Sequence, residues 1–464
     1  MILSSFNWQK RYQDLNLWAR KLYENAALKG HVLKEESEGA ECKREKATGP
    51  KTFGEDLYCF IKKSAFKAAL DMEAQNKFDA AAKEFLKFEK EFPHSEDADK
   101  ALYNAAVNYQ RMQNLQGIID VHKKMLASYP KSTFTPDVIY MIGVKYEQNV
   151  DFMSAASYFE ILAKTYPDYK NSADALLASA VYREAEKRYA DAYRSLAIFV
   201  EKFPKHKDVQ NARLHMGELL EKQKKHVEAI EAYRKFLEEY PEDKELAVKI
   251  HRSIGVNYVA FGNPAKANYA FRTAEEIYNK LPPSSRKKDE MRYALAESKF
   301  LMADAAYQDY QKNRPSGDEK VYAEKLQERT MLLTGLEKAY LGVIEVKSTA
   351  WAIRSLCRLG GVYKDHADDF ANVPIPAKYN ENQVKFYKQA LQNLQLEALK
   401  SADQYYQACL DKGKELDFFS EDTRNAEAYF DQRDKNRAIL NYAYPLKFED
   451  LIEDDYLYGR IELQ

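Results

Sequence analysis

The chain has 464 residues, and its 71 basic and 72 acidic residues leave a formal net charge of −1. This balance argues against nucleic-acid binding, which needs a basic excess or a basic stripe. No apolar run approaches the roughly 18 residues of a membrane-spanning helix, and no secretory core of roughly 7–15 apolar residues follows the first residue. We therefore expect a soluble chain with no nucleic-acid partner, no direct membrane span and no targeting segment. Gly and Pro are scarce, at 16 and 14 residues, which favours helix over strand.

The N-terminal region, residues 1–61, is predicted to be a capping helix followed by a loop. Apolar residues at helical spacing within 5–28 indicate an amphipathic helix: Trp8, Tyr12, Leu15, Trp18 and Leu22. Its apolar face is expected to cover the structure that follows, because the open end of a stacked array needs a cap. Residues 34–54 are charged, contain Gly and Pro, and are typical of a loop.

A Tyr-Pro or Phe-Pro pair then recurs at one fixed interval. Each proline follows the last by 37 residues: Pro93, Pro130, Pro167, Pro204 and Pro241. A period between 20 and 50 residues indicates a stack of like structural units.

Within one unit, the pattern predicts two antiparallel helices. Gly143 and Ala155 are small enough to let two helices approach closely, and Tyr146 and Phe159 fill the remaining space. Pro167 ends the second helix because it donates no backbone hydrogen bond and its ring clashes with the preceding turn.

These residues resemble the tetratricopeptide repeat, whose pattern is W-x2-L-G-x2-Y…A-x3-F…P. Drifting copies predict six repeats, with boundaries at 62–98, 99–135, 136–172, 173–209, 210–247 and 248–284. The resemblance implies an all-α superhelical solenoid of antiparallel helix hairpins. It says little about function, because one fold serves many unrelated partners.

After the periodic region, residues 285–444 are predicted to continue as longer helices. These are expected at 286–312, 319–347, 349–371, 381–415 and 421–434. Gly360 and Tyr363, followed by Ala402 and Tyr406, suggest one or two degenerate, expanded hairpins of the same kind. A continuous helix over 381–415 would be about 50 Å long, so it should bend or project. The acidic tail, 445–464, is expected to be exposed.

One short stretch has a more particular likeness. Trp351 to Tyr363, with the proline-rich segment Ala371 to Pro376, resembles large repeat proteins of deltaproteobacteria, some of them adventurous gliding motility proteins. The repeats ending in Tyr-Pro or Phe-Pro also resemble Gram-negative envelope and periplasmic scaffolds. The resemblance implies a periplasmic or envelope-associated protein; the alternative is a cytoplasmic one.

The four cysteines include no C-x-x-C pair, which argues against a zinc or thioredoxin-like site. Cys42 and Cys59 flank a loop and could form a disulfide in an oxidising compartment. The alternative is two unpaired thiols.

No sequence motif supports catalysis or a bound cofactor, so we expect neither enzyme activity nor a cofactor or metal. The eight histidines are scattered, and phosphate-binding and nucleophile-elbow motifs are absent from the sequence. Ser64 and Lys67 fit S-x-x-K, but the other motifs of serine acylases are missing, and a chain rich in lysine meets this spacing by chance.

The first helix of each hairpin is expected to line a groove. The predicted groove residues recur with the 37-residue period: Phe66, Leu70, Tyr103, Val107, Tyr140, Val144, Leu177, Val181, Leu214 and Glu218. They suit a partner helix or extended peptide, with Phe66, Tyr103 and Tyr140 as anchors. Alternatively, they support packing between hairpins. The related repeats that clamp a chaperone carboxylate use Lys and Asn there, so we expect a different kind of partner.

The sequence therefore predicts a non-enzymatic scaffold that binds a protein or peptide, within an envelope or motility complex. The alternative is a structural subunit of a multiprotein machine, held through its outer faces and C-terminal helices.

Overall fold

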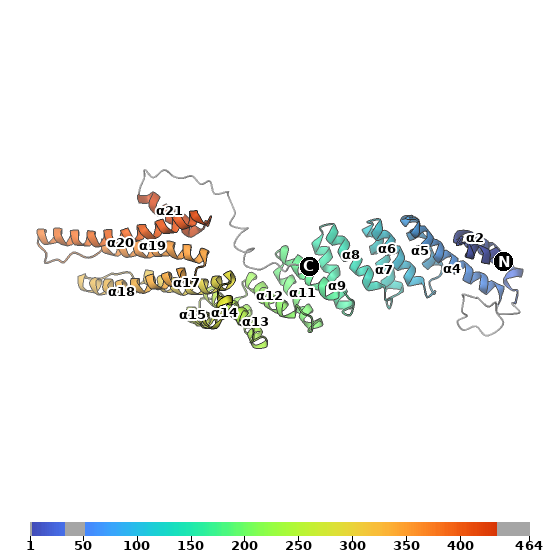
Figure 1. Cartoon of the computed structure of the whole chain (residues 1–464), viewed down its shortest axis with the longest axis horizontal. Helices are drawn as coiled ribbons and strands as arrows, with labels where there is room; N and C mark the ends of the chain where they lie inside the picture. The colour runs from blue at the N-terminus through green and yellow to red at the C-terminus, as the bar shows by residue number, and fades with distance from the viewer. Residues whose placement is uncertain (1, 33–51, 434–464) are drawn as a thin grey trace. The chain divides into compact units, whose positions relative to one another are not determined.

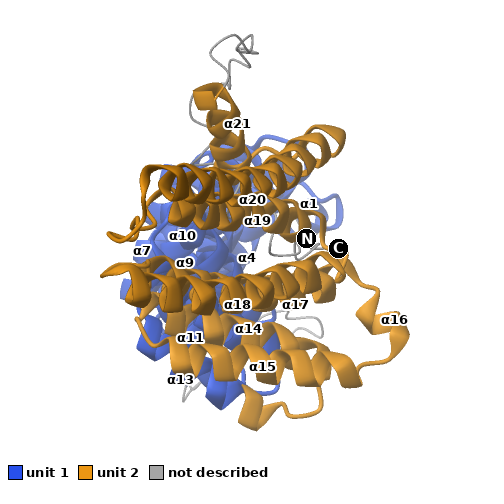
Figure 2. Cartoon of the chain, turned by 90° about the vertical axis from the view of Figure 1, so that its left-hand side faces the viewer, with its two compact units in different colours: residues 1–236 blue, residues 237–464 orange. Residues whose placement is uncertain are grey.

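The computed structural model describes residues 2–32 and 52–433. All regular structure in these ranges is helical, apart from an isolated bridge between Val32 and Thr52. The chain divides into two compact units, Met1–Phe236 and Leu237–Gln464 (Figures 1 and 2). The predicted all-α fold is confirmed. The acidic tail, most of the predicted loop at 34–54 and Cys42 lie outside the described residues.

Unit 1 begins with a cap that differs from the single predicted helix. It consists of α1 (Ile2–Trp8), α2 (Tyr12–Tyr23) and α3 (Ala26–Lys29). Lys10 has φ 55° and breaks the helix, so Trp8 is 88% exposed instead of continuing the packed stripe. Leu15 and Ala19 are buried, and α2 packs on α4. The Asn16 side chain donates to the backbone oxygen of Ile61 at 2.8 Å.

Consecutive helices then pair as hairpins. They are α4 (Phe53–Ala74), α5 (Phe78–Glu91), α6 (Ala98–Arg111), α7 (Leu115–Ser128), α8 (Thr135–Gln148), α9 (Phe152–Thr165), α10 (Ser172–Ala185), α11 (Tyr189–Lys202), α12 (Val209–Lys222) and α13 (His226–Glu239). From α6 to α12, each first helix begins 37 residues after the one before it. The helices therefore follow the period of the prolines, although α4 begins before residue 62.

The turn inside each hairpin contains one residue in the left-handed region. These residues are also 37 apart and have φ between 57° and 62°: Asn76, Gln113, Val150, Lys187 and Lys224. The next hairpin has Gly262 at this turn, with φ 76°. Left-handed backbone is costly for a β-branched residue such as Val150, so the geometry of the hairpin imposes this turn even on residues that do not favour it.

Small residues allow the paired helices to approach closely, as the sequence predicts. A Cβ atom added to Gly143 would lie 2.3 Å from Cε1 of Phe159, and the same contact pairs Gly217 with Tyr233. Each aromatic ring thus occupies the space that a side chain on the facing helix would need.

Most helices of unit 2 are longer than those of unit 1. The helices of unit 2 are α14 (Lys244–Ala260), α15 (Pro264–Lys280), α16 (Pro283–Arg286), α17 (Asp289–Lys312), α18 (Glu319–Ile344), α19 (Thr349–Ala371), α20 (Glu381–Glu415) and α21 (Glu421–Arg433). The close contact recurs between Gly255 and Phe271 and between Gly360 and Tyr406. None of the helices within the described ranges combines the length and apolarity required to cross a bilayer.

A disulfide that the sequence analysis did not predict joins α19 to α20. It links Cys357 and Cys409, whose Cα atoms are 5.1 Å apart. Both cysteines are buried, in a cluster with Ile353, Ala402 and Tyr406. The second half of α20 is therefore held to α19 by a covalent bond as well as by packing.

Candidate functional site

The ten predicted groove residues all lie on the first helices of the hairpins of unit 1, two each on α4, α6, α8, α10 and α12. We call this set the first-helix face. Leu70 and Val181 are exposed, at 42% and 51%. Phe66 is buried, and the other members are half-buried. The first-helix face therefore contains accessible apolar surface, but the exposure differs from one member to the next.

The aromatic members of the first-helix face also support packing. Phe66 lies edge-on to Phe85, with ring centroids 5.3 Å apart, and Tyr103 stacks on Phe134 at 5.0 Å. Tyr140 packs beside partly buried rings of its own cluster. Such aromatic pairs stabilise by about 0.5–1.5 kcal/mol beyond the area they bury. Phe66 belongs chiefly to the core, while the tyrosines contribute to both packing and surface.

Glutamates one turn further along the first helices join successive hairpins. The Asn108 side chain donates to Glu73 Oε2 at 3.2 Å, and the Tyr182 hydroxyl donates to Glu147. Glu184 lies 2.6 Å from His215 Nε2. These contacts were not predicted from the sequence, although glutamates at 73, 147, 184 and 221 follow the 37-residue period.

The charges around Glu184 shift the pKa values of both partners. Burial by itself lowers the pKa of His215, but the hydrogen bond and charge of Glu184 outweigh it, so the pKa is raised. Burial raises the pKa of Glu184, but His215 and Lys222 outweigh it and lower the pKa. Both members of the pair are therefore charged only at pH values between the pKa of Glu184 and the pKa of His215.

Ser64 and Lys67 both contact residues of α2. The Ser64 hydroxyl donates to the backbone oxygen of Phe60 at 2.5 Å and accepts a hydrogen bond from Asn16 at 2.9 Å. The Lys67 ammonium lies 5.4 Å from the centroid of the Tyr12 ring. Both side chains thus contribute to packing around the α2 cap.

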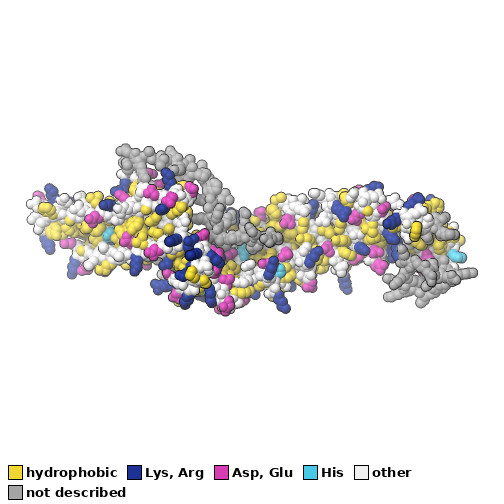
Figure 3. Space-filling view, viewed as in Figure 1, with side chains coloured by type: hydrophobic (Ala, Val, Ile, Leu, Met, Phe, Trp, Pro, Cys, Tyr) yellow, Lys and Arg dark blue, Asp and Glu magenta, His cyan; other side chains and the backbone are white. Residues whose placement is uncertain are grey.

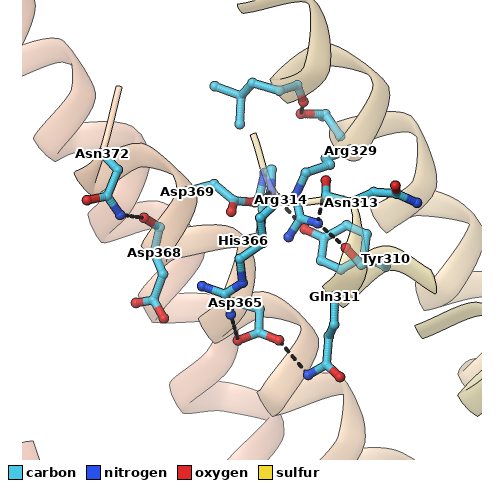
Figure 4. Close-up of polar contacts among 12 residues, drawn as sticks. Tyr310, Gln311, Asn313, Arg314, Arg329, Asp365, His366, Asp368, Asp369 and Asn372 are labelled. Carbon is cyan, nitrogen blue, oxygen red and sulfur yellow. Dashed lines mark hydrogen bonds and ion pairs between the residues drawn. The ribbon is translucent and has the colours of Figure 1, made fainter. Parts of the chain in front are cut away.

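Unit 2 contains a buried polar network at the junction of α17, α18 and α19 (Figure 4). Arg329 is 1% exposed, and its Nε donates to Asp369 Oδ2 at 2.6 Å. Its guanidinium also lies 3.6 Å from the centroid of the Tyr310 ring. The Tyr310 hydroxyl is 3.2 Å from His366 Nδ1.

Asp365 is the second carboxylate of this network. It accepts hydrogen bonds from Tyr307 at 2.7 Å, from Gln311 at 2.9 Å and from Arg314 at 3.2 Å. Burial, together with Asp365, raises the pKa of the Tyr307 hydroxyl. The two carboxylates thus accept hydrogen bonds from arginines and from neutral donors, and the network links α17, α18 and α19.

In the parts of the chain that the structure describes, no group of three or more His, Cys, Asp or Glu side chains could hold a metal ion. Hydrophobic and charged side chains of both signs are interspersed over the visible face of each unit (Figure 3).

Comparison with known proteins supports the repeat assignment. Residues 211–243, which span most of α12 and all of α13, match the family model described as the tetratricopeptide repeat. No curated protein matches the sequence.

Solved structures of repeat proteins are similar over long stretches. A tetratricopeptide repeat protein from Parabacteroides merdae has 13% identity and a TM-score of 0.26, covering 72% of this chain and 99% of its own. MamA from Desulfovibrio magneticus has 18% identity and a TM-score of 0.25, with coverage of 39% and 96%. A putative kinesin light chain from Podospora anserina has 12% identity and a TM-score of 0.26, with coverage of 40% and 98%.

At these identities and TM-scores, the structural likenesses carry no information about the function of this chain. The family match and the periodic packing are independent of them. Residues 211–243 therefore match the tetratricopeptide repeat within an all-α fold, and three other hairpins repeat the contact between Gly217 and Tyr233.

Proposed function

We propose that this protein is a non-enzymatic scaffold that binds a partner protein or peptide on the first-helix face of unit 1. One observation carries the proposal: apolar positions recur on five successive first helices at a 37-residue interval, and some of them are exposed. A specific interface buries roughly 800 Å² on each partner. A partner helix or extended segment lying across several hairpins could reach that area.

The contacts on this face suggest which residues would dominate binding. Phe66 is already packed against Phe85, so a partner gains little additional burial there. Leu70 and Val181 are exposed, and Tyr103 and Tyr140 are half-buried. We therefore expect the exposed aliphatic residues and the two tyrosines to be the anchors, because a few well-packed residues carry most of the energy of an interface.

Site-specific photo-crosslinking in the native host tests this function. A crosslinking amino acid at Leu70 or Val181 should capture a defined partner. The matched control is the same crosslinking amino acid at Leu126 or Ile161, which lie on second helices and are 44% and 45% exposed. The variant L70E/V181E should lose the partner at unchanged helicity. Equal capture from both sets of positions, or full binding by L70E/V181E, would contradict the proposal.

The second candidate function is a structural subunit held through its C-terminal helices. It is supported by α20, where Phe386 and Leu396 are 72% and 60% exposed. If this function is correct, F386E/L396E should release the protein from its assembly, while L70E/V181E should not.

We further propose that the protein works in a periplasmic or envelope-associated complex, such as a motility assembly; the cytoplasm is the alternative. The Cys357–Cys409 disulfide supports an oxidising compartment, because such bonds are rare in reducing cytosol. Alkylation of free thiols during lysis of the native host, followed by mass spectrometry, should find this pair oxidised. Two alkylated thiols would favour the cytoplasm.

A further inference from the structure

We propose that the α1–α2 cap docks on an anionic lipid bilayer surface. This inference concerns a different part of unit 1 from the first-helix face. It starts from two of the three tryptophans of the chain, Trp8 and Trp18, which are 88% and 45% exposed. Tryptophan is enriched at membrane–water interfaces, where its ring meets the acyl boundary and its N–H meets the headgroups.

The two faces of α2 have different environments. Leu15 and Ala19 are 2% and 0% exposed where α2 packs on α4. Leu17 is 51% exposed, and Lys21 is exposed one turn further on. Helical geometry places Leu17 roughly opposite Leu15, and Lys21 about 120° around the helix from Leu15. The outer face therefore combines apolar side chains with a cation, as interfacial helices do.

The charge of the cap is complementary to an anionic surface. Residues 1–32 contain five basic and two acidic side chains, a net charge of +3, whereas the whole chain has −1. Arg20 pairs with Glu91 at 2.6 Å, and Arg11 pairs with Asp14 at 2.8 Å. The Lys21 ammonium lies 4.9 Å from the centroid of the Trp18 ring. The lysines thus lie on the same cap as the exposed rings.

These features favour a lipid surface over a protein partner. A protein interface is typically depleted in lysine and closes around buried anchors. The cap instead presents separate exposed rings with lysines near them, which suits rings inserted at the acyl boundary and ammonium groups among phosphates. Binding by so few apolar groups is expected to be reversible.

The experiment uses the full chain and vesicles of phosphatidylcholine, with or without phosphatidylglycerol. We expect co-sedimentation with the anionic vesicles only. We also expect a blue shift of tryptophan emission and quenching by brominated lipid. Trp351 is 4% exposed in unit 2, so its emission should not change. W8A/W18A should abolish sedimentation, and K10Q/K21Q should weaken binding by roughly fivefold for each charge removed.

Matched controls distinguish binding through the cap from nonspecific binding by exposed aromatic residues. Tyr269 and Phe386 are exposed aromatic residues outside the cap, at 77% and 72%. Y269A and F386A should bind vesicles like the wild type. The proposal is overturned if the wild type fails to bind anionic vesicles, if its emission neither shifts nor is quenched, or if W8A/W18A binds normally.

Discussion

A methyl group added at Gly255 should destabilise unit 2 by about 2 kcal/mol. Its Cβ would lie 2.2 Å from Cε1 and 2.4 Å from Cδ1 of Phe271. Phe271 is fully buried, so its rigid ring cannot move aside, and α14 and α15 must separate. Overpacking of this kind typically costs about 1–3 kcal/mol. We expect the upper end of that range, reduced by the roughly 1 kcal/mol by which Ala favours a helix over Gly.

Gly335 provides the matched control. It also lies within a helix of unit 2, but a Cβ there would meet nothing within 4 Å. G335A should therefore stabilise by roughly 1 kcal/mol, while G255A should lower the melting temperature by about 4–8 °C. Thermal and urea unfolding followed by circular dichroism measure both. Either of two results would refute this reasoning. One is that G255A is as stable as the wild type, and the other is that the double variant G255A/F271L is no more stable than G255A.

Other consequences of the structure are equally direct. V150N should stabilise unit 1 by about 1 kcal/mol in urea unfolding, because Val150 has φ 62° and Asn tolerates left-handed backbone. R329M should cost about 3–5 kcal/mol, because it leaves Asp369 buried without its cation, and R329M/D369L should recover most of the loss. The stabilisation from His215, whose pKa is raised, should be complete below about pH 6.5 and lost as pH rises through its folded pKa. The stabilisation from Glu184, whose pKa is lowered, should be lost as pH falls below about 4.5. The H215Q variant should show a smaller loss of stability than the wild type as pH rises through the folded pKa of His215.

The periodic sequence is sufficient to predict that consecutive helices pair as hairpins. Proline ends a helix by local chemistry, and a glycine facing an aromatic ring is a pattern that four of the hairpins contain. The breaks around Pro315 and Pro374 likewise separate the long helices of unit 2, and α20 has the predicted limits. The single N-terminal helix was a wrong prediction, because the left-handed turn at Lys10 occurs at a residue that does not favour it.

The exposure of individual groove residues could not be predicted. Phe66 and Leu70 lie one turn apart on the same stripe of α4, yet one is buried and the other is 42% exposed. The period predicts which side of each helix faces its neighbours. The partners of Phe66, such as Phe85, depend instead on how neighbouring helices pack. The Arg329–Asp369 pair was missed for a similar reason. It joins α18 and α19, whose register the repeat does not set.

The Cys357–Cys409 disulfide, in contrast, could have been predicted from the sequence. Gly360 and Tyr406 occupy the small and aromatic positions of an expanded hairpin, and the structure places them in contact. Cys357 comes three residues before Gly360, and Cys409 comes three residues after Tyr406. In an antiparallel pair with that register, the two cysteines face each other, within the Cα separation that a disulfide requires. One small–aromatic pair therefore fixes the register of a hairpin even where the 37-residue period has ended, and cysteines elsewhere in such a hairpin can be paired by the same reasoning.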